Sequence, residues 1–160
     1  MNLPCRALLL LAALGSCAGT PRSASMKDTA KKDSLSAVTA YNRQILDLFT
    51  GPAFRELDCD ALYGPGMARR GVHCFVSTLK REELTARISR GVASFAEGAE
   101  WAENYGQFDR FYRLSRDPAY GFSFGVSRVA YKDLIYRDQP GVWGHFESDV
   151  IYSPIIRETK

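Results

Sequence analysis

The sequence predicts one α+β domain over residues 35–160, with two helices packed on one face of a curved antiparallel sheet of about four strands. Apolar side chains recur every three or four residues over residues 35–49 and again over 78–96, which indicates two amphipathic helices. From residue 108 onward apolar residues alternate with small or polar ones, as in strands with one buried face. Helices followed by a run of strands are typical of the α+β class.

The first helix is predicted from apolar residues that share one stripe, and Gly51-Pro52 ends it. Residues 52–57 are expected to add a short helix, and residues 72–76 a short strand around Cys74. The second long helix, residues 78–96, is expected to bury four apolar residues. The two stripes are Leu35, Val38, Tyr41, Ile45, Leu48 and Phe49, then Leu84, Ile88, Val92 and Phe95.

Three or four strands are predicted after residue 108, with a bend at Gly125 and an end to the last strand at Pro154. Residues 138–141, Asp-Gln-Pro-Gly, have the composition of a hairpin turn. This order of elements and the glycine-marked bend resemble the cone-shaped domains of the nuclear transport factor 2 class, in which a curved sheet wraps around helices. The resemblance concerns the fold and implies no activity.

The N-terminus has the layout of a secretory signal peptide over residues 1–16. Arg6 precedes an apolar run over residues 7–14, and small residues follow at positions 15–19. A membrane-spanning helix needs about 20 apolar residues, so this run is too short to remain as a permanent anchor. The pattern therefore predicts export from the cytoplasm.

The end of this segment, Leu14-Gly15-Ser16-Cys17, resembles the bacterial lipobox. The resemblance implies that Cys17 receives a diacylglycerol and becomes the first residue of a lipid-anchored envelope protein facing the periplasm. The single Arg6 departs from the two or more basic residues common in such signals. Ala18 stands where an aspartate would signal retention at the inner membrane, which favours the outer membrane. The alternative is cleavage after Ala18, which would release a secreted, soluble protein.

Two cysteines, Cys59 and Cys74, remain in the domain, and an exported protein is expected to pair them in a disulfide. Closing a loop of about 15 residues is worth roughly 3 kcal/mol in the chain-entropy model. A metal site with Asp58, Asp60 and His73, or a reactive thiol beside His73, are the alternatives. The spacing matches no zinc pattern, so no metal is expected.

The mild basicity of the chain belongs to its N-terminal part. Residues 17–34 are polar and are predicted to form a flexible tether, whereas residues 35–160 carry 16 basic and 16 acidic side chains. The balanced domain gives no support for nucleic-acid binding, and the basic tether could lie near anionic lipid.

Six residues are candidates for a ligand or contact face, because aromatic and titratable side chains cluster late in the chain. They are Trp101, Tyr105, Trp143, His145, Glu147 and Asp149. The last three alternate along a predicted strand and would therefore share one face of it. The same pattern is expected of an ordinary sheet face that is exposed to solvent and binds nothing. An acidic stretch containing Glu97, Glu100, Glu103 and Asp109 could supply paired carboxylates for glycoside chemistry, but a solvated connection explains it as well.

These observations favour a small envelope lipoprotein with a non-catalytic binding or interaction domain and no cofactor. The sequence lacks a serine elbow, a Walker phosphate loop and a dinucleotide fingerprint. Its expected partners are the membrane, through lipid on Cys17, and an envelope protein or small ligand. The alternative is a periplasmic or secreted ligand-binding protein or enzyme with a pocket inside the curved sheet, with His145, Glu147 or Asp149 at its mouth.

Overall fold

The computed structural model describes residues 23–129 and 146–158, so the signal segment, Cys17, Trp143 and His145 lie outside the described residues. The chain divides into two units, Met1–Ser34 and Leu35–Lys160, and the second holds the sheet and its core. Helix α1 spans Ser23–Asp47, so it begins before Leu35, within the segment predicted as a tether. Within the described part of the chain, no helix is both long and apolar enough to cross a membrane.

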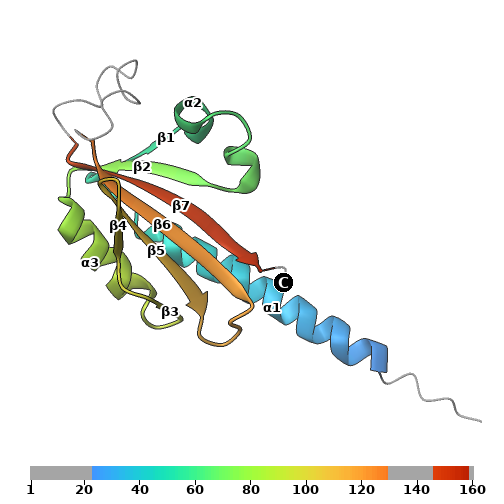
Figure 1. Ribbon diagram of the computed structural model, residues 1–160. Helices are drawn as coiled ribbons and strands as arrows, with labels where there is room; N and C mark the ends of the chain where they lie inside the picture. Colours follow the sequence, from blue (N-terminus) through green and yellow to red (C-terminus); the bar gives the residue numbers. More distant parts are fainter. Residues whose placement is uncertain (1–22, 130–145, 159–160) are drawn as a thin grey trace, which may run out of the picture. The chain divides into compact units, whose positions relative to one another are not determined.

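The domain belongs to the α+β class, as predicted, and its antiparallel sheet is open and has seven strands rather than about four. The strand order is β1-β2-β7-β6-β5-β3, and β4 pairs with β5 beside β3 (Figure 1). The strands are β1 (Phe54–Leu57), β2 (His73–Ser77), β3 (Ala96–Gly98), β4 (Ala102–Asn104), β5 (Gln107–Leu114), β6 (Tyr120–Arg128) and β7 (Ser148–Arg157). Three of them have only three or four residues, too few for alternation to be recognised in a sequence.

Two helices, α1 and α3 (Arg81–Val92), pack on the same face of the sheet, which we call the inner face. The predicted stripes are largely confirmed, although α1 begins its buried stripe at Val38 because Leu35 is 65% exposed. Helix α3 starts where the Glu83 carboxylate accepts a hydrogen bond from the Lys80 backbone N–H (3.2 Å). Large aromatic side chains of the strands fill the inner face beneath these two helices: Phe75, Tyr112, Phe122, Phe124 and Tyr152.

Asn42 connects α1 to the sheet. Its side-chain oxygen accepts hydrogen bonds from the Tyr152 hydroxyl and from the Ile155 backbone N–H (3.1 Å), both of which belong to β7. Tyr152 has no exposed surface, and this burial raises the pKa of its hydroxyl. Helix and strand are therefore joined by a hydrogen-bonded pair inside the core as well as by apolar contact.

We expect Asn42→Ala to lower the free energy of unfolding by about 2–4 kcal/mol, because it leaves two buried donors without a partner. Tyr152→Phe removes one donor and leaves the Asn42–Ile155 bond intact, so its expected cost is about 1 kcal/mol. Urea denaturation of both variants measures the difference. Equal losses would show that the backbone bond to Ile155 contributes nothing.

Part of the other side of the sheet is covered by the segment that the disulfide closes. This segment, which we call the disulfide lobe, comprises residues 58–72 with α2 (Cys59–Tyr63) and a 3-10 turn (Ala68–Arg70). The predicted Cys59–Cys74 disulfide is present, with the two Cα atoms 5.4 Å apart. Beneath the lobe lies a second, smaller apolar cluster, which contains Val76, Val129, Leu57, Leu62 and Phe146.

The loop of the lobe is held by carboxylates. Asp58 caps α2 by accepting from the Asp60 backbone N–H (2.9 Å), and Asp60 accepts from the Ala68 backbone N–H (2.9 Å). The bond from Ala68 is the main reason that the pKa of Asp60 lies below its ordinary value. These carboxylates therefore have structural partners within the lobe.

The structure corrects two further predictions about elements. Residues 52–57 contain no helix; Phe54–Leu57 forms edge strand β1, whose four residues pair with β2. Pro154 does not end β7, which continues to Arg157. The register between β6 and β7 shifts there: one residue, Phe122, lies between the paired Gly121 and Ser123, whereas two lie opposite on β7. Proline is tolerated at such a bulge because its missing N–H falls where the ladder is interrupted.

Gly125, where the sequence predicts a bulge or a bend, pairs regularly with both Asp109 and Ile151, so no bulge lies there.

Candidate functional site

The inner face offers little room for a ligand, because aromatic rings occupy the space between helices and sheet. Phe122 stacks on Tyr112 with ring centroids 5.2 Å apart, and Phe124 stacks on Tyr152 at 5.1 Å. All four rings are at most 2% exposed. Side chains therefore fill the centre of the inner face, where the alternative function would place a pocket.

The four predicted contact residues that the structure describes have different surroundings. Asp149 is 1% exposed and accepts a hydrogen bond from the Tyr63 hydroxyl of the lobe (3.2 Å). The expectation that Asp149 lies on a solvent-exposed sheet face is wrong, because the disulfide lobe covers that part of the sheet. Glu147 is exposed and lines a small hollow together with Arg81 and Glu82 at the start of α3 and Arg128 at the end of β6.

Trp101 is half-buried and turns toward the core. Its indole N–H donates to the Ser89 hydroxyl (3.1 Å), and the Arg110 guanidinium donates to the same oxygen (3.1 Å). The register explains this position. Gly98 of β3 pairs with Tyr112 and Ala102 of β4 pairs with Asp109, so three residues on the edge lie opposite two on β5. The edge strand therefore bulges at residues 99–101, and Trp101 anchors it.

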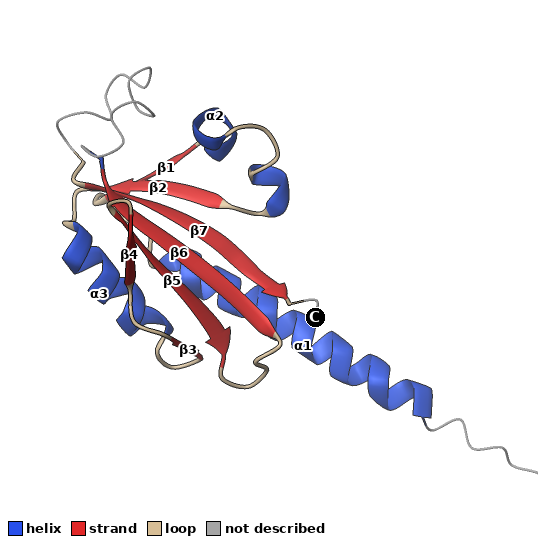
Figure 2. Cartoon of the chain, in the orientation of Figure 1, coloured by secondary structure: helices blue, strands red, loops and turns tan. Residues whose placement is uncertain are grey.

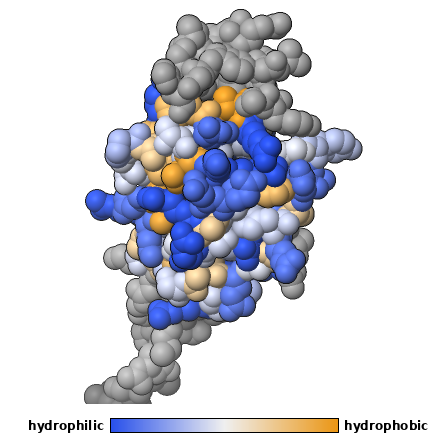
Figure 3. All heavy atoms as spheres, turned by 90° about the vertical axis from the view of Figure 1, so that its left-hand side faces the viewer, coloured by the Kyte–Doolittle hydropathy of each residue, from blue (hydrophilic) through white to orange (hydrophobic). Residues whose placement is uncertain are grey.

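Tyr105 is 92% exposed. It forms the two-residue turn of the β4–β5 hairpin with Gly106, and both residues have positive φ angles, 47° and 77°. Such turns favour asparagine and glycine, so a tyrosine here is unusual. Figure 3 shows the side of the domain that includes α3 and β4 as mainly hydrophilic, with apolar residues scattered among polar ones.

The predicted acidic and metal-binding groups have other surroundings. The His73 imidazole contacts the Glu56 carboxylate (2.9 Å), and Glu103 pairs with Arg81 (3.5 Å). Within residues 23–129 and 146–158, no three His, Cys, Asp or Glu side chains converge as metal ligands. Cys59 and Cys74 are joined to each other, so neither is a reactive thiol.

We call the side of β3, β5, β6 and β7 that faces away from α1 and α3 the open face. The disulfide lobe covers part of this side at Asp149. Figure 2 shows α1 behind β5, β6 and β7, with no described helix in front of them. Strand β6 turns a row of small residues to this side: Gly121, Ser123, Gly125 and Ser127. Larger side chains of β5 and β7 rise on either side of the row.

Two side chains of β5 lean across the glycines of β6. A Cβ atom at Gly121 would lie 2.2 Å from the ring of Phe111, and one at Gly125 would lie 2.5 Å from the amide nitrogen of Gln107. Both glycines are needed for this close approach. Phe111 remains 43% exposed, and a neighbouring side chain, Ile156, is 62% exposed.

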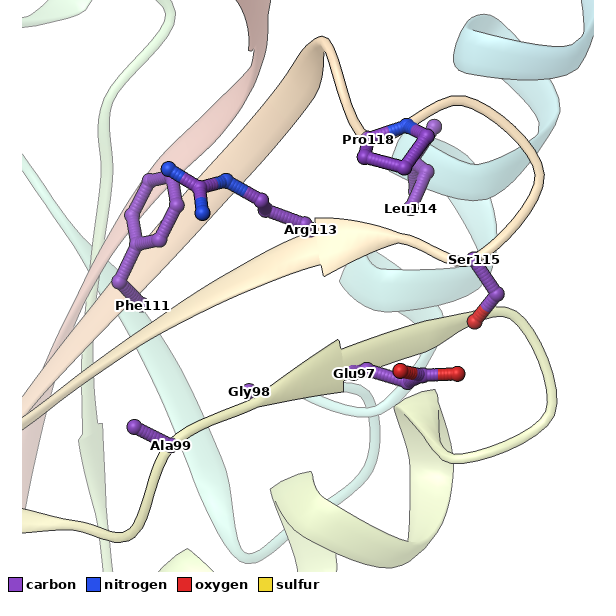
Figure 4. Close-up of a pocket in the computed structure, with 8 residues that line it drawn as sticks. All are labelled: Glu97, Gly98, Ala99, Phe111, Arg113, Leu114, Ser115 and Pro118. Carbon is purple, nitrogen blue, oxygen red and sulfur yellow. The ribbon is translucent and has the colours of Figure 1, made fainter.

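Between these side chains lies a groove of about 480 Å³ that runs across β5, β6 and β7. We call it the β6 groove. Ser123 and Gly125 form its floor, and Asp109, Phe111 and Ile151 are among the residues of its walls. A second hollow, of about 450 Å³, lies on the other side of Phe111 (Figure 4). Its lining includes Glu97, Arg113 and Pro118, and the Arg113 guanidinium lies 5.4 Å from the centre of the Phe111 ring.

The chain matches no family model, no curated protein sequence and no solved structure. Its function is therefore inferred from its own residues and their geometry.

Of the residues of the open face, Asp109 and Glu97 stand out in the sequence only as members of an acidic stretch, and nothing in the sequence marks Phe111. The strict alternation of glycine and serine at positions 121–127 was the available signal. Such a row leaves one sheet face low, so that neighbouring strands must form the walls of a groove.

Proposed function

We propose that the protein is a small lipid-anchored envelope lipoprotein whose α+β domain binds a partner through the open face of its sheet, without catalysis. The observation that carries the proposal is the contrast between the two faces. Packed aromatic rings fill the inner face, whereas two hollows flank the half-exposed Phe111 on the open face. A hollowed surface with exposed apolar side chains is what a binding site requires.

Two features support export and anchoring. The Cys59–Cys74 disulfide suits an oxidising compartment such as the periplasm. The segment ending in Leu14-Gly15-Ser16-Cys17 supplies an export signal and an acceptor for lipid. We propose the outer membrane as the destination, because Ala18 follows Cys17; the alternative is release as a soluble protein after cleavage at Ala18.

A ligand-binding protein or enzyme with a pocket inside the sheet is a weaker proposal. It would need a cavity between sheet and helices, where Phe122, Phe124 and Tyr152 are packed, and it would need Asp149 at the mouth rather than under the lobe. The cone-like sheet of the nuclear transport factor 2 class stays a prediction.

The anchoring is tested by metabolic labelling of the full chain with an alkyne analogue of palmitate in the producing bacterium. We expect the wild-type chain and Cys5→Ser to incorporate the label and Cys17→Ser to lose it completely, because Cys17 supplies the acceptor thiol. Cys5→Ser is the matched control, since it removes a thiol from the same signal segment. Labelling of Cys17→Ser at the wild-type level would rule out the proposed anchor.

A further inference from the structure

We propose that the β6 groove binds a cationic side chain, lysine or arginine, of an extended segment of a partner protein, with Asp109 as the group that contacts the charge. The inference rests on the proposed function, because it assumes that the open face is the binding surface. It goes further by naming the chemistry of the partner.

The position of Asp109 is fixed by a short relay of hydrogen bonds. The Ser127 hydroxyl donates to the Gln107 side-chain oxygen (3.3 Å), and the Gln107 amide donates to one carboxylate oxygen of Asp109 (2.6 Å). Ser127 is fully buried and Asp109 lines the groove, so the relay runs from the protein interior to the groove. The relay leaves the second carboxylate oxygen of Asp109 able to accept a hydrogen bond from a ligand.

No cation of the described residues pairs with Asp109, although arginines of the described domain form four ion pairs elsewhere. Arg110, which also borders the groove, is committed to the Ser89 hydroxyl and the Gly98 carbonyl (3.1 Å). Arg113 pairs with Glu158 (3.2 Å). The nearby cations are thus bonded to other groups of the fold, whereas the Asp109 carboxylate has a hydrogen bond from Gln107 and no cationic partner among the described residues.

The rest of the β6 groove adds to this charge. Glu100 is a second carboxylate among the lining residues, whereas the guanidinium of Arg110 is bonded toward Ser89 and the edge strand. The groove therefore presents acceptors and negative charge, which favour a ligand that donates hydrogen bonds and carries positive charge.

Phe111 provides an aromatic wall for such a ligand. Its ring lies across Gly121 and stays 43% exposed, and it borders the β6 groove. The Arg113 guanidinium already lies 5.4 Å from the centre of this ring, so the ring is accessible to a cation. A carboxylate and an aromatic ring that share a groove of about 480 Å³ suit the methylene stem and charged head of one long basic side chain.

The test measures binding of three acetylated, amidated pentapeptides, Gly-Ala-X-Ala-Gly with X as arginine, lysine or glutamate, to the full mature chain in detergent. We expect the arginine and lysine peptides to bind saturably, with an affinity that falls as salt is raised, and the glutamate peptide not to bind. Asp109→Asn should weaken the two cationic peptides about tenfold to a hundredfold, because a charge-assisted bond is lost.

Glu97→Gln is the matched control, since it removes one negative charge from the same face but in the other hollow, and it should change affinity less than about threefold. Gly125→Ala gives a second readout. Its Cβ displaces the flexible end of Gln107 and disrupts the relay, so it should weaken binding even though Asp109 is retained. Equal binding by wild type and Asp109→Asn would overturn the inference.

A neutral oligosaccharide serves as a further probe that separates this inference from the proposed function. If the sugar or the glutamate peptide binds instead, and Ser123→Trp abolishes that binding by filling the groove, the cationic partner is wrong and the open face is right. If Ser123→Trp leaves the binding of every active probe unchanged, both are wrong. Failure of all probes to bind, together with a concentration-dependent dimer that Ser123→Trp dissociates, would assign the face to a second copy.

Discussion

We expect Phe124→Ala to lower the free energy of unfolding by about 3–5 kcal/mol, the largest effect of any single substitution considered. Phe124 is 1% exposed and lies among four other rings of the core, those of Phe49, Tyr112, Phe122 and Tyr152. Its removal leaves a cavity that these four rings cannot fill, because they are held on three different strands and just beyond the end of α1. Urea denaturation monitored by tyrosine and tryptophan fluorescence measures the loss.

Phe111→Ala is the matched control on the neighbouring strand. It removes the same ring from the open face, where 43% of the side chain already meets solvent, so we expect a loss below about 1.5 kcal/mol. The ratio of the two losses reports which face of the sheet is the core. Similar losses for the two variants would show that the open face is covered in the folded protein.

The second large effect is expected from the disulfide. Replacing Cys59 and Cys74 together with alanine should lower the free energy of unfolding by about 3 kcal/mol, because the bond closes a separation of 15 residues in the unfolded chain. Both cysteines are at most 4% exposed, so the double substitution also removes buried contact between the lobe and β2. The measurement is denaturation of the wild type with and without reductant, compared with the double variant.

Reductant should destabilise the wild type by a similar amount and leave the double variant unchanged. The Tyr63–Asp149 bond should also weaken, because the lobe that supplies Tyr63 is held by the disulfide. A double variant as stable as the oxidised wild type would mean that the lobe holds its place without the bond.

The long elements could be predicted from the sequence because one physical pattern dominates each of them. Leu84, Ile88 and Val92 recur at helical spacing and are fully buried in α3. The pairing of Cys59 with Cys74 followed from counting the cysteines that lie beyond the predicted signal segment and the predicted lipid attachment at Cys17. Such signals are local, so they require no knowledge of how distant segments meet.

The misplaced elements depend on contacts between distant segments. Residues 54–57 are a strand because β2 supplies a partner, which local propensity does not reveal. Pro154 stays within β7 because the register with β6 shifts at that point. The pairing of β5 with two short strands likewise becomes visible only in the folded sheet.

The same limit applies to the candidate site. Alternation correctly separated Asp149 from the inward-facing Val150, but it could not show that the disulfide lobe covers the outer side of that strand. It placed Phe111 in a strand without showing that glycine at position 121, ten residues later, lets the ring lie across the sheet. A groove between strands depends on register, and register is a property of the sheet as a whole.

The intact mass of the mature protein, extracted from membranes of the producing cells, distinguishes a lipid-anchored chain from a released one. We expect a chain that begins at Cys17 and carries the added mass of a diacylglycerol thioether, with Cys59 and Cys74 oxidised. An unmodified chain beginning at Gly19, recovered from the soluble fraction after cleavage behind Ala18, would contradict it.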